Sequence, residues 1–148
     1  MTAELIPLAP GLSATGRLDR ADIDALAQAG VRTIINNRPD GEDPGQLMAA
    51  EAKRLAEAHG IAYHHIPVTA ATLTRADVDA FAATLRDAAE PVVAHCRSGT
   101  RSTLLWALTR MREGADPLGL IAAEVDKGNP LGFFLVASGE QDMVAINC

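Results

Sequence analysis

The sequence predicts one α/β domain in which helices flank a central, mostly parallel sheet. Short apolar runs typical of buried strands alternate along the chain with stretches that carry helix caps and an apolar stripe. This alternation is typical of a layered fold whose functional site lies beyond the carboxyl ends of the strands. With 148 residues, 48% of them hydrophobic, the chain is long enough to bury the core of one such domain.

Four segments have the character of strands. Residues 5–12 hold two prolines and a glycine, and they predict a short edge strand or a lead-in to the sheet. Residues 31–36, 61–68 and 92–95 are rich in apolar and β-branched residues. A Pro-Asp-Gly turn at 38–41 closes the first of these three.

Capping residues place the helices between these strands, because a Ser, Thr or Asp followed three positions later by an acidic or amide side chain marks a helix start. The capping pairs are Asp19 with Asp22, Asp43 with Gln46, and Thr74 with Asp77. The predicted helices run from the first pair to Gly30, over 44–59, from the third pair to about Ala89, and from about Ser102 to Arg112.

The chain changes character in its last part. A helix is predicted over 116–126, and the apolar residues 131–136 are expected to pack in the core. We therefore expect a single domain over residues 1–148, with its core at about 5–113 and a C-terminal helical extension over 114–148. The extension is also a candidate contact with another subunit.

One stretch, residues 91–102, carries the candidate chemistry. Its apolar strand leads into a tight loop that begins at Cys96, and a helix follows, so the loop lies at a helix N-terminus. Backbone N–H groups at such a terminus bind anions, Gly99 allows the backbone to curl closely, and Arg101 adds a forked guanidinium. These positive groups stabilise a thiolate, so Cys96 is predicted to be a nucleophile.

The simplest alternative is that Cys96 is a small core residue. The loop that follows it consists of Arg97, Ser98, Gly99 and Thr100, and their polar character does not suit a core. This favours the reactive cysteine. We expect the same four residues to bind the substrate.

Composition excludes several classes of function. A formal net charge of −6 disfavours a nucleic-acid partner. The two cysteines, Cys96 and Cys148, are too few for a disulfide framework or a zinc site, and they suit a reducing compartment. Since no signal peptide or membrane-spanning stretch is apparent, we expect a cytoplasmic protein with no membrane partner, metal or cofactor. Its expected partner is a small anionic or phosphorylated substrate.

The order His95-Cys96, then Gly99, then Arg101-Ser102 resembles the phosphate loop of the cysteine-dependent protein phosphatases. The turn at 38–42 and the segment 63–68 make the resemblance more specific to one family. Together these residues are similar to the bacterial phosphatase-like domain found in beta-lactamase-hydrolase-like proteins, a relative of the dual-specificity phosphatases. The similarity covers roughly residues 5–113.

The resemblance implies a cysteine-phosphatase-like three-layer fold and roles for three residues. Cys96 would be the nucleophile, and Arg101 would clamp the oxyanion. Ser102 would supply the hydroxyl that holds the thiolate or helps it to leave.

The sequence departs from the phosphatase pattern in two ways. The spacing Cys-x4-Arg is one residue short, and Cys96 to Arg101 resembles the six-residue loop of the rhodanese sulfurtransferases. The upstream region that would supply an aspartate general acid holds no carboxylate. His65, or its neighbour His64, and Asp40 are therefore the candidate acids.

These observations leave three functions open. The first is a thiolate-dependent phosphatase-like hydrolase that forms a phosphocysteine. The second is a rhodanese-like sulfurtransferase that carries a persulfide on Cys96. The third is a non-catalytic anion-binding or redox-sensing module, because an exposed thiolate is readily oxidised.

Overall fold

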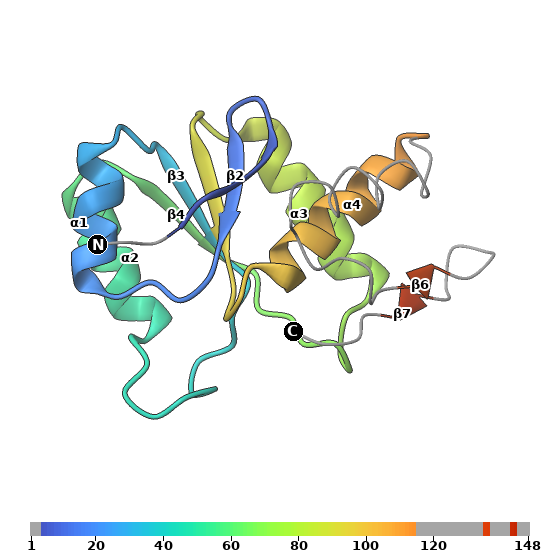
Figure 1. Cartoon of the computed structure of the whole chain (residues 1–148), viewed down its shortest axis with the longest axis horizontal. Coiled ribbons are helices and arrows are strands. Elements are labelled where there is room, and N and C mark those ends of the chain that lie inside the picture. The colour runs from blue at the N-terminus through green and yellow to red at the C-terminus, as the bar shows by residue number, and fades with distance from the viewer. Residues whose placement is uncertain (1–3, 115–134, 137–142, 145–148) are drawn as a thin grey trace.

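The computed structural model describes residues 4–114, 135–136 and 143–144, and its larger part is a sheet between two pairs of helices (Figure 1). The elements in chain order are β1 (Ile6–Ala9), β2 (Leu12–Thr15), α1 (Arg20–Gln28), β3 (Thr33–Asn36), α2 (Ala49–Ala58), β4 (Ala62–His65), α3 (Arg75–Asp87), β5 (Val92–His95), α4 (Thr100–Arg112), β6 (Leu135–Val136) and β7 (Met143–Val144).

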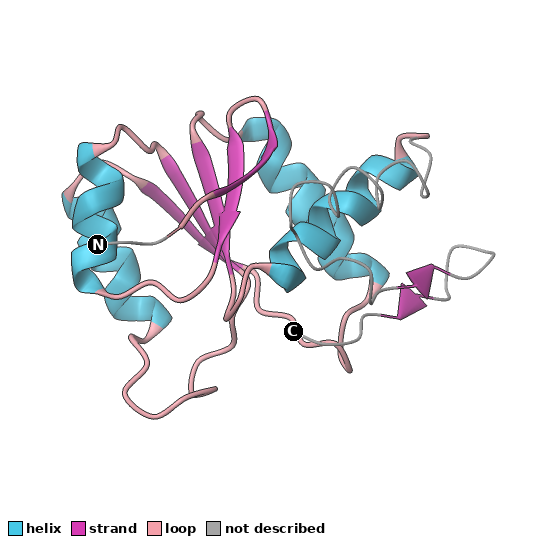
Figure 2. Cartoon of the chain, in the orientation of Figure 1, coloured by secondary structure: helices cyan, strands magenta, loops and turns pink. Residues whose placement is uncertain are grey.

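The main sheet has five strands in the order β1-β2-β5-β3-β4. Figure 2 shows its strands, in magenta, between the helices. β1 runs antiparallel to β2, and the other neighbours are parallel. Central β5 pairs with β2 on one side and with β3 on the other, so their last residues, Thr15, His95 and Asn36, lie at one level. The sheet therefore delivers three chain segments to a single edge.

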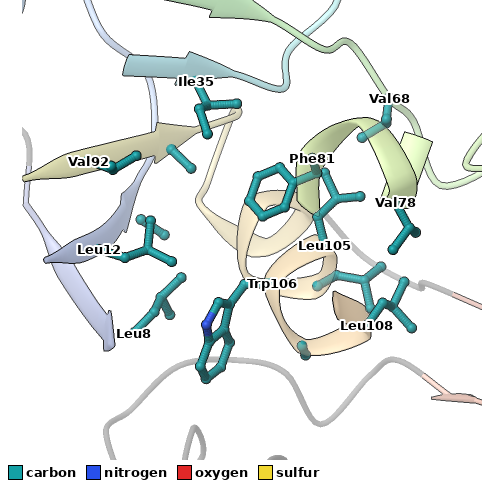
Figure 3. Packing of buried hydrophobic residues seen from close by; sticks show 14 residues of the cluster. Leu8, Leu12, Ile35, Val68, Val78, Phe81, Val92, Leu105, Trp106 and Leu108 are labelled. Atoms are coloured by element: carbon teal, nitrogen blue, oxygen red, sulfur yellow. The ribbon is translucent and has the colours of Figure 1, made fainter. Parts of the chain in front are cut away.

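Two hydrophobic clusters hold the layers together. Ile23 and Leu26 of α1 pack with the alanines of α2 against one face of the sheet. On the other face, α3 and α4 pack their side chains against the strands, with Phe81 and Leu105 fully buried between them (Figure 3). All residues of β3 and β5 are buried, as expected of central strands that are covered on both faces.

The predicted fold class is confirmed: a mostly parallel sheet is flanked by helices on both faces. The first and third predicted capping pairs are also confirmed. In each, the side chain of the first residue accepts from the backbone of the second and the reciprocal bond is present, at α1 and at α3.

Two predicted elements are wrong at their boundaries. The segment 5–12, predicted as a short edge strand or a lead-in, contains the edge strand β1, but it extends too far, because the chain turns at Pro10-Gly11 and begins a second strand, β2, at Leu12. The helix predicted over 44–59 begins at Ala49 instead. The carboxylate of its expected cap, Asp43, forms ion pairs with arginine side chains instead. The Gln46 side chain accepts the Asp43 N–H at 3.2 Å, which forms only a local turn.

The helix predicted over 116–126, most of the apolar segment 131–136, and Cys148 lie outside the described residues. The single-domain boundaries and the C-terminal extension therefore remain predictions. β6 and β7 pair antiparallel as a small separate sheet. Among the described helices, none combines the length and the apolar character that crossing a membrane requires.

Candidate functional site

Cys96 follows β5 directly and lies just before α4. Its side chain is completely buried, and the Gly99 N–H donates to Sγ at 3.1 Å. The Cys96 N–H donates to the Thr15 carbonyl at 3.3 Å, so the neighbouring strand fixes the entry to the loop. The sulfur thus lies at the N-terminal end of a thirteen-residue helix, where N–H groups and the helix dipole favour negative charge.

Two glycines allow the Cys96 loop to close against β2. Gly99 is the N-cap of α4 at φ 93°, a left-handed conformation that favours glycine. Gly16 follows β2, and a Cβ there would lie 3.0 Å from the Arg97 carbonyl oxygen. A larger residue at position 16 would therefore push the loop outward.

Arg101 lies in the first turn of α4 with only 4% of its side chain exposed. Its Nη1 donates to the Val68 carbonyl at 2.8 Å and to Glu42 Oε2 at 2.7 Å. Its Nη2 donates to Glu42 Oε1 at 2.9 Å. Paired contacts of this kind fix both the position and the plane of a guanidinium.

Glu42 is a site residue that the sequence reasoning missed. It also accepts from Arg38 Nε at 3.0 Å, so one carboxylate bridges two buried arginines. The hydrogen bond from Arg101 is the main reason that the pKa of Glu42 is lowered, and Arg38 adds to the effect. Glu42 therefore stays ionised near neutral pH. The signal that could have found it is its place in the loop after β3, at the same edge as Cys96.

Ser102 lies next to Arg101 on α4 and is fully buried. Its hydroxyl donates to Asn37 Oδ1 at 2.8 Å, and Asn37 Nδ2 donates to the Ile66 carbonyl at 3.0 Å. A hydroxyl has one donor hydrogen, so Ser102 would have to rotate away from Asn37 before it could donate to Sγ. In this arrangement, Ser102 joins α4 to the segments after β3 and β4.

The side chains of the two candidate acids, Asp40 and His65, both hydrogen-bond to backbone groups. The Asp40 side chain accepts from the Ala49 N–H at 2.8 Å and so caps the first turn of α2. His65, the last residue of β4, places Nε2 2.9 Å from the Arg38 carbonyl oxygen. A carbonyl only accepts, so Nε2 carries the hydrogen. His64 and His65 are both exposed residues of β4.

The remaining loop residues bond to one another and to a neighbouring segment. The Arg97 side chain is half exposed and lies 3.3 Å from Asp43 Oδ1. Ser98 donates its hydroxyl to Thr100 Oγ1 at 3.1 Å, which ties the loop to the first residue of α4. The structure therefore brings Cys96, Arg97, Ser98, Gly99, Thr100, Arg101 and Ser102 into one loop and helix start.

Comparisons with known proteins agree with this geometry. The family described as beta-lactamase hydrolase-like protein, phosphatase-like domain, matches residues 4–112. The chain belongs to this family. A beta-lactamase hydrolase-like protein of Agrobacterium fabrum (strain C58 / ATCC 33970) is 42% identical over 103 residues, which make up 70% of this chain and 24% of that protein. The chain spans about a quarter of the length of the curated relatives it matches.

Solved structures support the same fold for this phosphatase-like domain. A candidate phosphatase from Neisseria meningitidis Z2491 superposes with a TM-score of 0.77 at 38% identity, covering 85% of this chain and 89% of that one. The core catalytic domain of the PP-IP phosphatase SIW14 from S. cerevisiae gives a TM-score of 0.67 at 15% identity, covering 89% and 80% of the two chains. The second likeness shows the fold alone. Family and fold together support a phosphatase-like function.

His95 precedes the nucleophile candidate of the phosphatase-like domain and is buried beneath the loop. Burial lowers its pKa to about 4, and the nearby charges of Arg38, His65 and Arg101 act in the same direction. A backbone hydrogen bond with Cys96 opposes them. His95 is therefore a neutral imidazole at the pH of the cell.

Within the described part of the phosphatase-like domain, no three His, Cys, Asp or Glu side chains are grouped so that they could hold a metal ion. The charged side chains around Cys96 are mostly arginines. This arrangement suits recognition of an anion by hydrogen-bond donors.

Proposed function

We propose that the chain is a cysteine-dependent phosphatase-like hydrolase that acts on a small phosphorylated substrate through a phosphocysteine intermediate. The observation that carries the proposal is the placement of Cys96 Sγ at the N-terminus of α4, where it accepts the Gly99 N–H at 3.1 Å. Arg101, the second residue of α4, is held in place by Glu42 and the Val68 carbonyl.

In the first step, the Cys96 thiolate attacks phosphorus. The S–P bond forms as the P–O bond to the leaving group breaks, and the leaving oxygen takes a proton. The loop N–H groups and the Arg101 guanidinium stabilise the charge on the equatorial oxygens. In the second step, water attacks phosphorus, the S–P bond breaks, and phosphate and the thiolate are released.

The leaving group determines how much this mechanism needs a general acid. Positioned proton transfer is worth about a hundred- to ten-thousandfold in rate. Asp40 is bonded to the α2 backbone, and the His65 Nε2–H faces the Arg38 carbonyl. His65 can act as an acid only when its second nitrogen is also protonated. We therefore expect aryl phosphates, whose oxygen leaves without strong assistance, to be better substrates than alkyl phosphates.

A second candidate function is sulfur transfer, in which Cys96 takes a sulfane sulfur and carries it as a persulfide. The six-residue loop from Cys96 to Arg101 favours it, because a short ring of N–H groups encloses a small object. Sulfur transfer also needs no general acid. The third candidate, a non-catalytic anion-binding or redox-sensing module, predicts binding without turnover.

One pair of assays separates the three functions. Phosphate release from an aryl phosphate is measured beside the intact mass after exposure to thiosulfate, with Cys96→Ser as the control in both. The proposal predicts release that the mutant loses, while the mutant still binds phosphate by calorimetry. A stable gain of one sulfur without phosphate release would instead establish sulfur transfer. If both the wild type and Cys96→Ser bind phosphate but neither turns over a substrate, only the non-catalytic anion-binding or redox-sensing module remains.

A further inference from the structure

Three neighbouring parallel strands are each followed by an arginine at the edge of the sheet where Cys96 lies. β2, β3 and β5 end at Thr15, Asn36 and His95, which lie at one level of the sheet. Two residues beyond each end stand Arg17, Arg38 and Arg97. The pairing register therefore gathers three cations on the edge that also carries Cys96.

One carboxylate joins all three arginines. Asp43 Oδ2 lies 3.5 Å from Arg17 Nε and also contacts Arg38 Nη2, while Asp43 Oδ1 lies 3.3 Å from Arg97 Nη2. Glu42 neutralises part of the charge of Arg38 and Arg101. Four guanidinium groups thus share two carboxylates at this edge.

Acidic residues also border the neighbouring cavity of about 430 Å³, which Arg17, Arg38 and Asp43 help to line. Asp19 and Asp22 also line it, but each accepts from the backbone N–H of the other in the α1 capping box. They are therefore bonded within their own turn.

The arginines differ sharply in exposure. Arg38 has 5% of its side chain exposed, whereas Arg17 has 64% and Arg97 has 47%. Exposed ion pairs are weak because water screens them, so an incoming anion can replace Asp43 at Arg17 and Arg97 at little cost. The buried Arg38 would keep its carboxylate partners.

Arg17 and Arg97 also lie next to the nucleophile. Arg97 follows Cys96 in the chain, and Gly16, which precedes Arg17, packs so closely on the loop that a Cβ would lie 3.0 Å from the Arg97 carbonyl oxygen. An anion held by both side chains would thus lie beside a phosphoryl group held in the Cys96 loop. Guanidinium groups suit this task because they bind phosphate in a bidentate manner.

We propose that Arg17 and Arg97 form a second anion subsite that selects substrates carrying a further phosphate close to the scissile one. The inference rests on the proposed function for the identity of the scissile group. Arg17 is then a specificity-determining residue outside the Cys96 loop. A purely structural ion-pair network would show no preference between one phosphate and two.

Binding measurements test the subsite without relying on turnover. In the Cys96→Ser background, calorimetry compares inorganic phosphate with pyrophosphate. We expect pyrophosphate to bind about tenfold more tightly, as is typical of an added charge-assisted contact. Arg17→Ala should remove that difference while changing phosphate affinity less than about twofold. Equal affinities for the two anions, or an equal loss of both in Arg17→Ala, would overturn the subsite.

Arg110→Ala is a matched control. Arg110 is 49% exposed and pairs with Glu113 near the C-terminal end of α4, far from the Cys96 loop along that helix. Pyrophosphate preference should survive in this variant, and its loss would contradict the proposal. Asp43→Asn should strengthen pyrophosphate binding by releasing the two arginines, and weaker binding would count against displacement of Asp43.

The two proposals fail separately. If the wild type hydrolyses no aryl phosphate but the Arg17-dependent preference persists, the proposed function is wrong and the subsite stands. If turnover depends on Cys96 but pyrophosphate gains nothing over phosphate, the proposed function stands and the subsite is wrong.

Discussion

Two buried guanidinium groups, those of Arg38 and Arg101, share the Glu42 carboxylate at the site. Glu42 accepts from both of them, and its lowered pKa reflects that stabilisation. Removing one partner of a buried ion pair costs much more than removing an exposed one, because the remaining charge loses its compensation. Glu42 is therefore a positioning residue that acts through Arg101.

Glu42→Gln should lower the free energy of unfolding by about 2 kcal/mol, because the buried Arg101 loses its carboxylate partner and Arg38 keeps only Asp43. It should also reduce kcat/KM for an aryl phosphate at least about tenfold, since Arg101 would no longer be held in its plane. Urea unfolding and steady-state kinetics measure the two effects. The control is Glu51→Gln, which removes the partly exposed ion pair between Glu51 of α2 and Arg20 of α1. Equal effects of the two variants would contradict the role given to Glu42.

The buried imidazole of His95 makes stability depend on pH. Its pKa falls from 6.5 to about 4 on folding, chiefly because of burial. Between these values the unfolded chain binds a proton that the folded chain does not. Stability is therefore fully present above pH 6.5 and falls as the pH is lowered toward 4, by about 1.4 kcal/mol per pH unit.

Urea unfolding at pH 7 and pH 5 should show this loss in the wild type. His95→Asn should flatten the dependence between those two values, whereas His59→Asn, at an exposed position paired with Asp24, should retain it. The carboxylates contribute to all three proteins, so the informative quantity is the difference between the slopes. Identical slopes in the wild type and His95→Asn would contradict a neutral, buried His95.

At the scale of the element, the loop between β5 and α4 depends on one backbone conformation. Gly99 has φ 93°, and Gly30, which follows α1, has a similar φ of 90°. No atom lies within 4 Å of a Cβ built at Gly30, and at Gly99 the nearest is Ile6 Cδ1 at 3.4 Å. A side chain at either position would therefore meet similar backbone strain, but the surroundings of the two positions are very different.

Alanine at either glycine should cost about 1 kcal/mol of stability, because an alanine disfavours positive φ. Only Gly99→Ala should also weaken phosphate binding, since the Gly99 N–H points at the sulfur and the loop must shift to relieve strain. Thermal unfolding and phosphate calorimetry on both variants provide the comparison. Unchanged phosphate affinity in Gly99→Ala would show that the loop conformation is not required for anion binding.

The sequence predicted elements well where the signal was local. The caps at Asp19 and Thr74 and the strand that ends at His95 depend on neighbouring residues only, and all three are present. The start of α2 differs from the prediction because Asp43 pairs with Arg17 and Arg97 from two other segments, as well as with Arg38 of its own loop. No local pattern could reveal that competition.

The same distinction applies to the site. The loop from Cys96 to Ser102 is contiguous, so its motif could be recognised in the sequence. Glu42 approaches Arg101 across 59 positions of the chain, and Arg17 approaches the loop through strand pairing. Those contacts depend on the register of β2, β3 and β5, which a single sequence does not specify.

At the scale of the whole molecule, a net charge of −6 opposes the positive rim around Cys96. Exposed charges farther from the site than the Debye length, about 8 Å at physiological ionic strength, are largely screened. The arginines act at contact distance, where screening is weaker. We therefore expect the attraction between these arginines and the phosphate to determine whether added salt weakens or strengthens substrate binding.

Raising the ionic strength from about 0.15 M to about 1 M should increase KM for an aryl phosphate several-fold, because the Debye length falls to about 3 Å. The change should appear mainly in KM rather than in kcat, since salt weakens encounter and binding before it alters the chemical step. Steady-state kinetics in sodium chloride supply the test. A KM that falls with added salt would mean that the overall negative charge dominates.

The role of Cys96 as the nucleophile is tested by the intact mass of the protein quenched with acid during turnover of an aryl phosphate. We expect a species heavier by one phosphoryl group, with the added mass on the peptide that contains Cys96. Cys96→Ser should show neither this species nor phosphate release. Phosphate release by the wild type with no phosphorylated peptide, or release that persists in Cys96→Ser, would contradict the assignment of Cys96 as the nucleophile.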